Sequence, residues 1–487
     1  MLTLDRPDLL ATCSYINGQW RQDSDTLMTV TNPANGEVIA QIPSLGAAET
    51  AEAIAAAKAA MPAWQATPAK QRAQILRKWF DLIMANQQDL AKILTAEQGK
   101  TLAEANGEVA YGAAYIEWFA EQAKRIDGDI IPSPGADKRL LVIKQPVGVV
   151  ASITPWNFPN AMIARKAAPA LAAGCTFVGK PASETPLSAL ALCVLAKEAG
   201  IPDGVLNMVV GQSSREIGGE MTSNPTVRKL TFTGSTPVGK VLMEQCIATC
   251  KKTSMELGGN APFVVFDDAD IDAAIEGVLV SKYRNSGQTC VCSNRIMVQA
   301  GIYDQFVQKL HAAVSEFRLG DGATAGVTHG PMITTKAVAD VQSMVDDAVA
   351  KGARLVIGGK VSPLGKHFFE PTILADARDD MRVFREEIFG PVAPVFKFNT
   401  EAEAIAMAND TEFGLAAYFY TRDLGRVFRF GEALEFGIVG INEGIISNEM
   451  APFGGVKESG SGREGSKYGI DDYLEIKYLC LGGLGNA

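Results

Sequence analysis

From residue 146 onward, short apolar runs alternate with stretches of helical pattern, and this alternation restricts the chain to few folds. Strands that alternate with helices are joined by right-handed crossovers, which place the strands parallel in one sheet. We therefore expect a parallel sheet with helices on both faces. The predicted strands are residues 147–153, 175–179, 205–210 and 229–232, and the predicted helices are residues 161–173 and 187–199.

A second α/β series is predicted from Pro262 to about Gly455. It begins with a strand at residues 263–266 and a helix after Asp270. The 487 residues exceed what a single core holds, which indicates two or three domains.

Two other regions complete the expected architecture. Residues 49–123, rich in Ala, Glu, Lys, Leu and Gln, predict successive amphipathic helices broken near Pro62 and Pro68. Residues 139–144 and 473–480 predict further strands, and the second alternates apolar and polar residues. A terminal strand of this kind can join the edge of its own sheet or that of a neighbouring subunit.

The composition argues against several classes of function. A net charge of −10 without a basic block argues against nucleic-acid binding. The start of the chain carries acids where a secretion signal needs cations and an apolar stretch, so we expect a cytoplasmic protein. No apolar run approaches the ~18 residues of a membrane span. The eight cysteines show no disulfide framework and the three histidines no ligand spacing, so we expect no metal.

Two segments carry groups for covalent chemistry. Residues 286–292 read Ser-Gly-Gln-Thr-Cys-Val-Cys, and residues 255–259 read Met-Glu-Leu-Gly-Gly. A lone cysteine is more often a small buried apolar residue than a nucleophile. Cys290 and Glu256 together, however, supply a thiol nucleophile and a carboxylate base. These are the two groups needed to oxidise an aldehyde through a thioester.

A glycine-containing segment, Phe-Thr-Gly-Ser-Thr-Pro-Val-Gly-Lys at 232–240, follows a predicted strand and opens a helix. Gly234 and Gly239 would let the backbone approach a phosphate, and the helix N-terminus offers free N–H groups. The Gly-x4-Gly-Lys spacing is that of an NTPase P-loop, but Val241 stands where that motif requires Ser or Thr. In isolation, a glycine turn before a helix is the commoner explanation.

Two more loops follow strands of the first predicted sheet. Asn157, in Thr-Pro-Trp-Asn-Phe-Pro, has an amide that can donate to an oxyanion, although by itself an Asn in a proline-flanked turn is commoner. Lys180 and Ser183 follow the next strand, where a dinucleotide fold meets the adenosine ribose. They suit a 2′-phosphate, while Glu184 weakens that inference and a solvated lysine is the alternative.

In sequence order, these motifs closely resemble those of the aldehyde dehydrogenase superfamily. The resemblance covers residues 15–480 and is also carried by Glu-Glu-Ile-Phe-Gly-Pro at 386–391 and Pro-Phe-Gly-Gly at 452–455. Within the superfamily, the chain is most similar to bacterial NADP-using succinate-semialdehyde dehydrogenases, with glutarate-semialdehyde dehydrogenases very similar. Residues 463–470 and the Cys-x-Cys at the nucleophile carry this closer likeness.

The resemblance implies an α/β fold of the aldehyde dehydrogenase type. The implied division is a Rossmann-type dinucleotide-binding domain at 1–124 and 146–256, an α/β catalytic domain at 257–470, and a small β oligomerisation extension at 125–145 and 471–487. A homodimer or homotetramer follows, without a choice between them. The resemblance also implies a cytoplasmic enzyme of GABA degradation.

The resemblance assigns roles to individual residues. Cys290 is the nucleophile, the Asn157 amide and the Cys290 backbone N–H hold the oxyanion, and Glu256 activates the water that hydrolyses the thioester. The implied cofactor is NADP, with NAD as the alternative. Its implied contacts are Trp156, Lys180, Ser183, Gly234, Ser235, Gly239, Leu257, Glu387 and Phe389.

The same resemblance implies a small semialdehyde substrate with a distal carboxylate. Arg165 and Arg284 match the family's carboxylate-binding arginines, and Ser447 matches their partner hydroxyl. A guanidinium binds a carboxylate in bidentate fashion better than an ammonium does. Without the match, both arginines would be taken for surface residues of helices.

Cys292 stands two residues after the nucleophile. In an extended chain, two such residues point the same way with Cα atoms near the ~6.8 Å limit for a disulfide. We hypothesise that a strained, readily reduced Cys290–Cys292 bridge is a redox switch. A packed thiol is the alternative.

Three positions depart from the family pattern. Gly179 replaces a bulkier apolar residue before the lysine, and Ser461 replaces a usual Leu. Glu443 stands close to the expected substrate pocket, where a carboxylate would repel an anionic substrate.

Two other interpretations are disfavoured. Acylating relatives, which pass the thioester to coenzyme A, generally lack the water-activating glutamate. A non-catalytic homologue would lack Cys290, Glu256 or Asn157, and all three are present.

Overall fold

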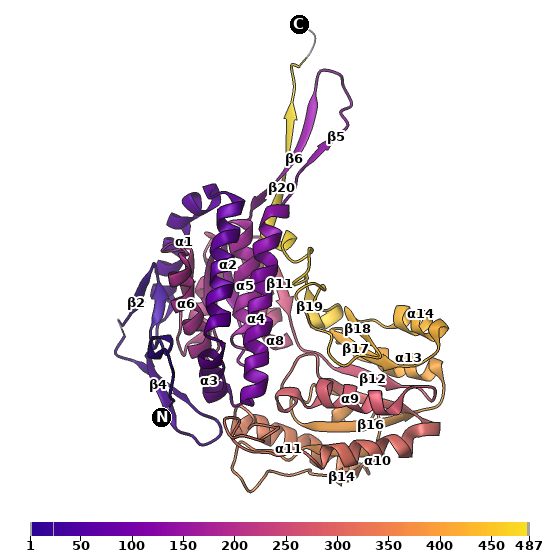
Figure 1. The fold of residues 1–487 in the computed structure, drawn as a ribbon. Helices are drawn as coiled ribbons and strands as arrows, with labels where there is room; N and C mark the ends of the chain where they lie inside the picture. The colour runs from indigo at the N-terminus through magenta and orange to yellow at the C-terminus, as the bar shows by residue number, and fades with distance from the viewer. Residues whose placement is uncertain (1, 23, 485–487) are drawn as a thin grey trace.

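The computed structural model describes residues 2–22 and 24–484, so residues 485–487 of the expected oligomerisation extension lie outside it, as do residues 1 and 23. Figure 1 shows two α/β bodies side by side and a narrow β arm that projects from the first. Among the described residues, no helix has both the length and the apolar character to cross a bilayer.

The first body is built on an eight-stranded sheet of order β19-β11-β10-β7-β8-β9-β1-β2. The strands from β11 to β9 are parallel, and the edges are antiparallel. The strands are β1 (Ser14–Ile16), β2 (Gln19–Arg21), β7 (Val149–Ile153), β8 (Thr176–Lys180), β9 (Leu206–Met208), β10 (Val227–Thr233), β11 (Lys252–Glu256) and β19 (Gly460–Ser461). A separate hairpin is formed by β3 (Leu27–Thr31) and β4 (Val38–Pro43).

Helices cover both faces of this sheet, which confirms the expectation from the strand–helix alternation. On one face, α2 (Ala69–Ala85), α3 (Gln87–Gln98), α4 (Leu102–Gln122), α5 (Ala161–Ala173) and α6 (Leu187–Ala199) share one apolar core. On the other face lie α1 (Ala47–Ala66), α7 (Ser214–Ser223) and α8 (Thr236–Ile247). The predicted helices 161–173 and 187–199 coincide with α5 and α6.

The second body contains a seven-stranded sheet of order β14-β15-β16-β13-β12-β17-β18, parallel except for β14. The strands are β12 (Ala261–Val265), β13 (Ser293–Gln299), β14 (Arg354–Ile357), β15 (Thr372–Ala377), β16 (Val392–Phe398), β17 (Ala416–Tyr420) and β18 (Ile438–Ile441). One face packs on α9 (Ile271–Lys282) and α10 (Tyr303–Val314). The other packs on α11 (Thr335–Ala350), α13 (Glu401–Asn409) and α14 (Leu424–Ala433), and α12 (Arg382–Arg385) precedes β16.

The arm is a three-stranded antiparallel sheet of order β20-β6-β5. It pairs β20 (Leu474–Leu481), near the end of the chain, with β6 (Arg139–Pro146), and β6 with β5 (Asp129–Ile131). The predicted strands 139–144 and 473–480 therefore meet in one sheet. The arm stands away from the first body (Figure 1). Several of its apolar side chains are exposed.

One expected helix break is wrong. Pro62 lies inside α1, which continues to Ala66 and ends before Pro68. Proline removes one backbone hydrogen bond of a helix. Pro62 is on the exposed side of α1, where water can hydrate the carbonyl that this leaves free.

Candidate active site

Two cavities meet at the side chain of Cys290. One, of about 280 Å³, is lined from α4, α5 and the loops that follow α9 and β18. The other, of about 240 Å³, is lined from the carboxyl ends of β7, β10 and β11. Cys290 and Met162 line both cavities. A thiol at this junction can contact molecules bound on either side.

The loop that carries Cys290 has a constrained backbone. Asn285 and Ser286 have positive φ angles of 52° and 54°. Gly287 follows at 76°, where a Cβ would lie 2.1 Å from the Gly390 carbonyl oxygen. At Gly259, after β11, a Cβ would lie 2.4 Å from the Cys290 carbonyl oxygen. The Gly-Gly that follows Glu256 thus lets the strand end lie against the nucleophile loop.

Asn157 lies in the loop after β7 and is buried beside the nucleophile loop. Its Nδ2 donates to the carbonyl oxygen of Gln288 at 3.0 Å. This bond orients the amide nitrogen, rather than the amide oxygen, toward the segment with Cys290. The second N–H of that nitrogen can donate to an oxyanion formed at the sulfur.

Glu256 is the last residue of β11, and it is buried. Its Oε2 has no hydrogen-bond partner in the part of the chain that the structure describes. Burial, and then the Glu464 carboxylate, raise the pKa of Glu256 well above its usual range, whereas Arg165 and Lys166 lower it. A carboxylate with a raised pKa is a stronger base toward water than an ordinary carboxylate.

The pKa of the Cys290 thiol is also strongly shifted. Burial, followed by the charge of Glu387, raises the pKa of Cys290 to about 12, while Arg165 and Arg284 oppose this effect. The thiol is therefore protonated at neutral pH until a base removes its proton.

The sequence analysis missed two residues beside Glu256. Lys166 forms a buried ion pair with Glu464 Oε1 and donates to Thr231 Oγ1 at 3.1 Å. Arg165 Nε lies 2.7 Å from Glu464 Oε2. The sequence held a weak signal for each residue. Lys166 follows the predicted substrate residue Arg165, and Glu464 lies in the segment 463–470 that carries the family likeness. However, the two are 298 residues apart, and only the fold joins them.

The second cavity contains several of the predicted cofactor residues. Trp156 and Phe389 contact edge to face, with ring centroids 5.6 Å apart. Glu387 Oε1 accepts from the Gly259 N–H at 3.1 Å, and burial raises the pKa of Glu387 to about 7. The predicted residues that line this cavity are Trp156, Gly234, Ser235, Leu257, Glu387 and Phe389.

This cavity fits a nucleotide cofactor. Ser235 is the N-cap of α8 but makes no side-chain cap bond, so its hydroxyl is available to a ligand. The free N–H groups of α8 suit a phosphate. Gly239 does not line the cavity. A Cβ there would lie 2.4 Å from Leu257 Cδ2, so this glycine permits helix–strand packing.

Lys180 and Ser183 lie farther along the same sheet, at and after the end of β8. Lys180 is buried, which lowers its pKa to about 8, and its ammonium donates to the Pro181 carbonyl oxygen at 3.2 Å. Ser183 Oγ donates to the Gly211 carbonyl oxygen at 3.1 Å. Both side chains therefore donate within the protein, at the place where the strand order puts a ribose.

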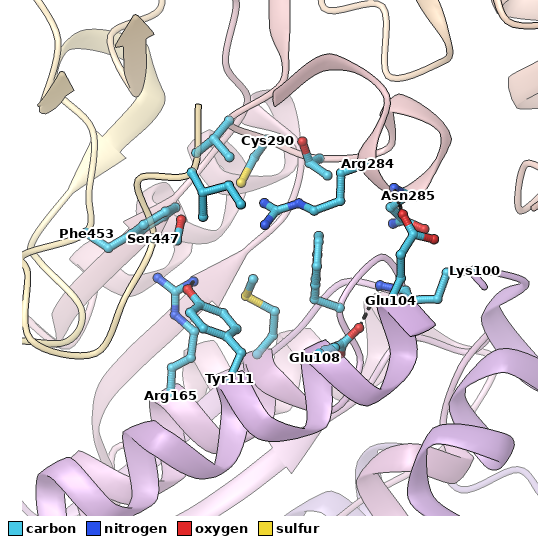
Figure 2. A pocket seen from close by; sticks show the side chains of 16 residues that line it. Lys100, Glu104, Glu108, Tyr111, Arg165, Arg284, Asn285, Cys290, Ser447 and Phe453 are labelled. Atoms are coloured by element: carbon cyan, nitrogen blue, oxygen red, sulfur yellow. Dashed lines mark hydrogen bonds and ion pairs between the residues drawn. The ribbon is translucent and has the colours of Figure 1, made fainter. Parts of the chain in front are cut away.

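The first cavity has a cationic side (Figure 2). Arg165 and Tyr111 approach it from below, Ser447 from the left, and Arg284 extends into its centre under Cys290. Arg165 Nη1 donates to the Tyr111 hydroxyl at 3.3 Å. Arg165 Nη2 and Arg284 Nε are buried, and neither has a hydrogen-bond partner among the described residues. Tyr111, which the sequence analysis also missed, carried no signal beyond its place on a helix.

The comparisons with known proteins agree with this geometry. The model of the aldehyde dehydrogenase family matches residues 20–479. The chain belongs to that family. A glutarate-semialdehyde dehydrogenase of Pseudomonas aeruginosa is 64% identical over 97% of this chain and 98% of its own. The NADP(+) succinate-semialdehyde dehydrogenase of Escherichia coli is 62% identical over 99% of this chain and 100% of its own.

Solved structures agree as well. The crystal structure of succinate-semialdehyde dehydrogenase from Burkholderia pseudomallei has a TM-score of 0.98 at 60% identity, and covers 99% of this chain and 100% of that one. The resemblance and the α/β fold inferred from the motifs are confirmed. This aldehyde dehydrogenase is therefore an oxidoreductase that uses NAD(P).

The three departures from the family pattern have local explanations. At Gly179, a Cβ would lie 2.8 Å from Met208 Sδ, so the methionine occupies the space of the bulkier residue. Ser461 pairs with Met255 at the edge of the sheet. Glu443 is exposed, caps the Ile445 N–H at 2.8 Å, and is not one of the described residues lining the first cavity.

The backbone at Cys292 differs from the expectation. The segment is a turn, in which the Cys292 N–H donates to the Thr289 carbonyl oxygen at 3.1 Å, and not an extended chain. The Cys292 thiol is free and buried, and its Sγ lies 3.3 Å from the Lys282 ammonium. No group of three or more potential metal ligands occurs in residues 2–22 and 24–484.

Proposed function

We propose that this enzyme oxidises succinate semialdehyde to succinate with NADP. The proposal depends on one observation: two arginines, Arg165 and Arg284, line the cavity that Cys290 closes, and each has a guanidinium N–H without a hydrogen-bond partner among the described residues. Unpaired buried donors are costly, and a distal carboxylate satisfies them. The aldehyde carbon at the other end of a short substrate then reaches the sulfur.

The residues of the site account for the two chemical steps. The Cys290 thiol gives its proton to water and, as a thiolate, attacks the aldehyde carbon, while the Asn157 amide and the Cys290 backbone N–H hold the oxyanion. NADP, which Ser235 and Phe389 would help to hold in the second cavity, would supply the acceptor for the hydride of that carbon. Loss of the hydride leaves Cys290 as a thioester. Glu256 then takes a proton from water, which hydrolyses the thioester to the free acid.

The preference for NADP is proposed from the end of β8. An acidic residue at that position would bond a ribose 2′-hydroxyl and repel a 2′-phosphate. Here Lys180 and Ser183 stand there instead, and the Escherichia coli relative is named for NADP(+). The negative charge of Glu184 acts on Lys180 and would weaken the binding of a 2′-phosphate, so NAD is the weaker alternative.

Glutarate semialdehyde is the second candidate substrate, because the relative from Pseudomonas aeruginosa is named for it. The test is kcat/KM for succinate semialdehyde, glutarate semialdehyde and hexanal, each with NADP and with NAD. We expect succinate semialdehyde with NADP to be highest and hexanal lowest. Equal values for hexanal would contradict the carboxylate site, and a preference for NAD would contradict the role of Lys180.

We also propose the remaining biological context. Residues 1–124 and 146–256 serve as the cofactor domain, 257–470 as the catalytic domain, and 125–145 with 471–487 as strands that join subunits of a homodimer or homotetramer. On the arm, Ile130 is 80% exposed and Ile476 72% exposed, which supports burial against another copy. A monomer in light scattering would contradict this. The proposed place of action is GABA degradation in the cytoplasm.

Finally, we propose that Cys292 forms a reversible disulfide with Cys290. Both are free thiols on one turn, and the Lys282 ammonium lowers the pKa of Cys292 against the larger effect of burial, which raises it. The test is inactivation by peroxide and recovery with dithiothreitol. If Cys292→Ala leaves the recovery intact, the switch is refuted.

A further inference from the structure

Three charged side chains at the start of α4 lie beside the substrate cavity, on the side away from Arg165 (Figure 2). Lys100 and Glu108 form an ion pair of 2.6 Å in which neither side chain is more than 1% exposed. Lys100 Nζ also donates to the Asn157 carbonyl oxygen at 2.8 Å and lies 3.8 Å from the centroid of the Phe158 ring. These partners occupy the ammonium, so it does not bind substrate.

The two glutamates hold the loops on either side of the nucleophile. Glu108 Oε1 accepts from the backbone N–H groups of Asn160 at 3.0 Å and Ala161 at 3.2 Å, where α5 begins. Glu104 Oε1 accepts from the Asn285 N–H at 2.6 Å in the nucleophile loop. Hydrogen bonds to Glu104 and Glu108 therefore hold the Asn157 loop and the Cys290 loop against the same helix, α4.

Asn285 completes the connection between the two loops. Its Nδ2 donates to the Asn157 carbonyl oxygen at 3.1 Å and to the Gln288 carbonyl oxygen at 3.2 Å. The Gln288 oxygen is also the acceptor for the Asn157 amide. The Asn157 carbonyl oxygen thus accepts hydrogen bonds from Lys100 and Asn285. The Asn157 side chain is oriented by the Gln288 carbonyl oxygen, to which Asn285 also donates.

A buried ion pair adds little stability compared with apolar side chains of similar size, so Lys100 and Glu108 need another reason to be there. We propose that Lys100 is a positioning residue that holds Asn157 where its amide meets the oxyanion. This inference rests on the proposed role of Asn157. Because a displacement of about 1 Å in a catalytic group can cost ~100-fold in rate, the ion pair controls the step in which the oxyanion forms.

The test uses the double variant Lys100→Met/Glu108→Gln, which leaves no buried charge unpaired and keeps an acceptor for the Asn160 N–H. We expect NADPH formation in the first turnover, followed by stopped flow at saturating succinate semialdehyde, to fall about 10- to 100-fold. Alkylation of Cys290 by iodoacetamide should change less than about 3-fold, because the thiol is untouched. When both changes are added to Asn157→Ala, the first turnover should fall less than about 3-fold further, since Lys100 acts through Asn157.

The matched control is Arg72→Met, which removes a buried cation that donates to the Ala172 carbonyl oxygen at 3.1 Å in the helical layer. It should lower the melting temperature and leave the first turnover unchanged. If the double variant does not fold, Asn285→Gly removes the other donor to Asn157 at a position whose φ of 52° suits glycine.

An unchanged first turnover in the double variant overturns the proposal. So does a loss that multiplies fully in the Asn157→Ala background, because Lys100 would then act elsewhere. If Asn157→Ala alone leaves the first turnover undiminished, the proposed oxyanion role itself fails, which is a distinct result.

Discussion

Replacing Arg284 by Met tests the carboxylate site most directly. Methionine keeps an apolar chain near Phe158, whose ring centroid lies 5.5 Å from the guanidinium carbon, and removes only the charge and its donors. The Arg284 guanidinium extends into the centre of the cavity, and its Nε has no hydrogen-bond partner among the described residues, so a bond to a substrate carboxylate would not replace one made by Nε within the protein. A hydrogen bond to a charged group is worth about 1.5–3 kcal/mol. At about 1.4 kcal/mol per factor of ten, the loss in kcat/KM should approach 100-fold.

The assay compares kcat/KM for succinate semialdehyde and hexanal in the same preparation, so that hexanal serves as the control for folding and for the thiol. We expect the large loss with succinate semialdehyde and less than about 3-fold with hexanal. Arg284→Lys should recover part of the loss, because it restores the charge but not the planar pair of donors. Equal losses on the two aldehydes would refute the reasoning.

Three more predictions follow from the geometry. Glu256→Gln should release about one NADPH per subunit in a burst and then stop, because hydride transfer precedes the hydrolysis that Glu256 assists; sustained turnover at the unmodified rate would contradict this. Glu464→Gln should move the rising limb of the pH–rate profile to lower pH. The base acts when ionised, and removal of the neighbouring carboxylate lowers the pKa of Glu256; an unmoved limb, or one moved to higher pH, would count against it. Gly259→Ala should reduce kcat/KM by at least about 100-fold, because the new Cβ would lie 2.4 Å from the Cys290 carbonyl oxygen and displace the nucleophile. Activity within a few-fold of the parent would show that the Cys290 loop moves to make room for the Cβ, and would contradict this prediction.

Much of the fold and site could be predicted because the signals are local. The strand–helix alternation carries its own period, and α5 and α6 match their predicted bounds. Asn157 and Glu256 were predicted because each lies in a short motif at the carboxyl end of a parallel strand, and such ends meet at one edge of a sheet. Cys290 also lies in a short motif, but that motif precedes β13 of the second sheet, so its place beside the other two depends on how the two bodies pack.

What could not be predicted depends on contacts distant in sequence or on backbone angles. The sequence around Lys166 does not predict its ion pair with Glu464, because the pair depends on how α5 and the chain after β19 pack against β11. The turn at Cys292 is closed by the hydrogen bond from the Cys292 N–H to the Thr289 carbonyl oxygen, which the Cys-x-Cys motif does not reveal. Gly239 belongs to a motif for phosphate, yet its neighbour is Leu257.

The charges around Glu256 make its pKa depend on whether the bound substrate carries a carboxylate. Arg165 and Lys166 are two buried cations beside Glu464 and Glu256, and Arg463 also lowers the pKa of Glu256. A substrate carboxylate adds one negative charge, which Arg284 neutralises from the centre of the cavity (Figure 2). Without Arg284 the added charge is uncompensated and raises the pKa of Glu256 further. The Arg284→Met variant should therefore move the rising limb of its pH–rate profile farther to higher pH with succinate semialdehyde than with hexanal, because only the loss of the cation beside Cys290 acts with hexanal. If the limb moves equally with both aldehydes, the substrate's charge does not affect the pKa of Glu256, and the reasoning is wrong.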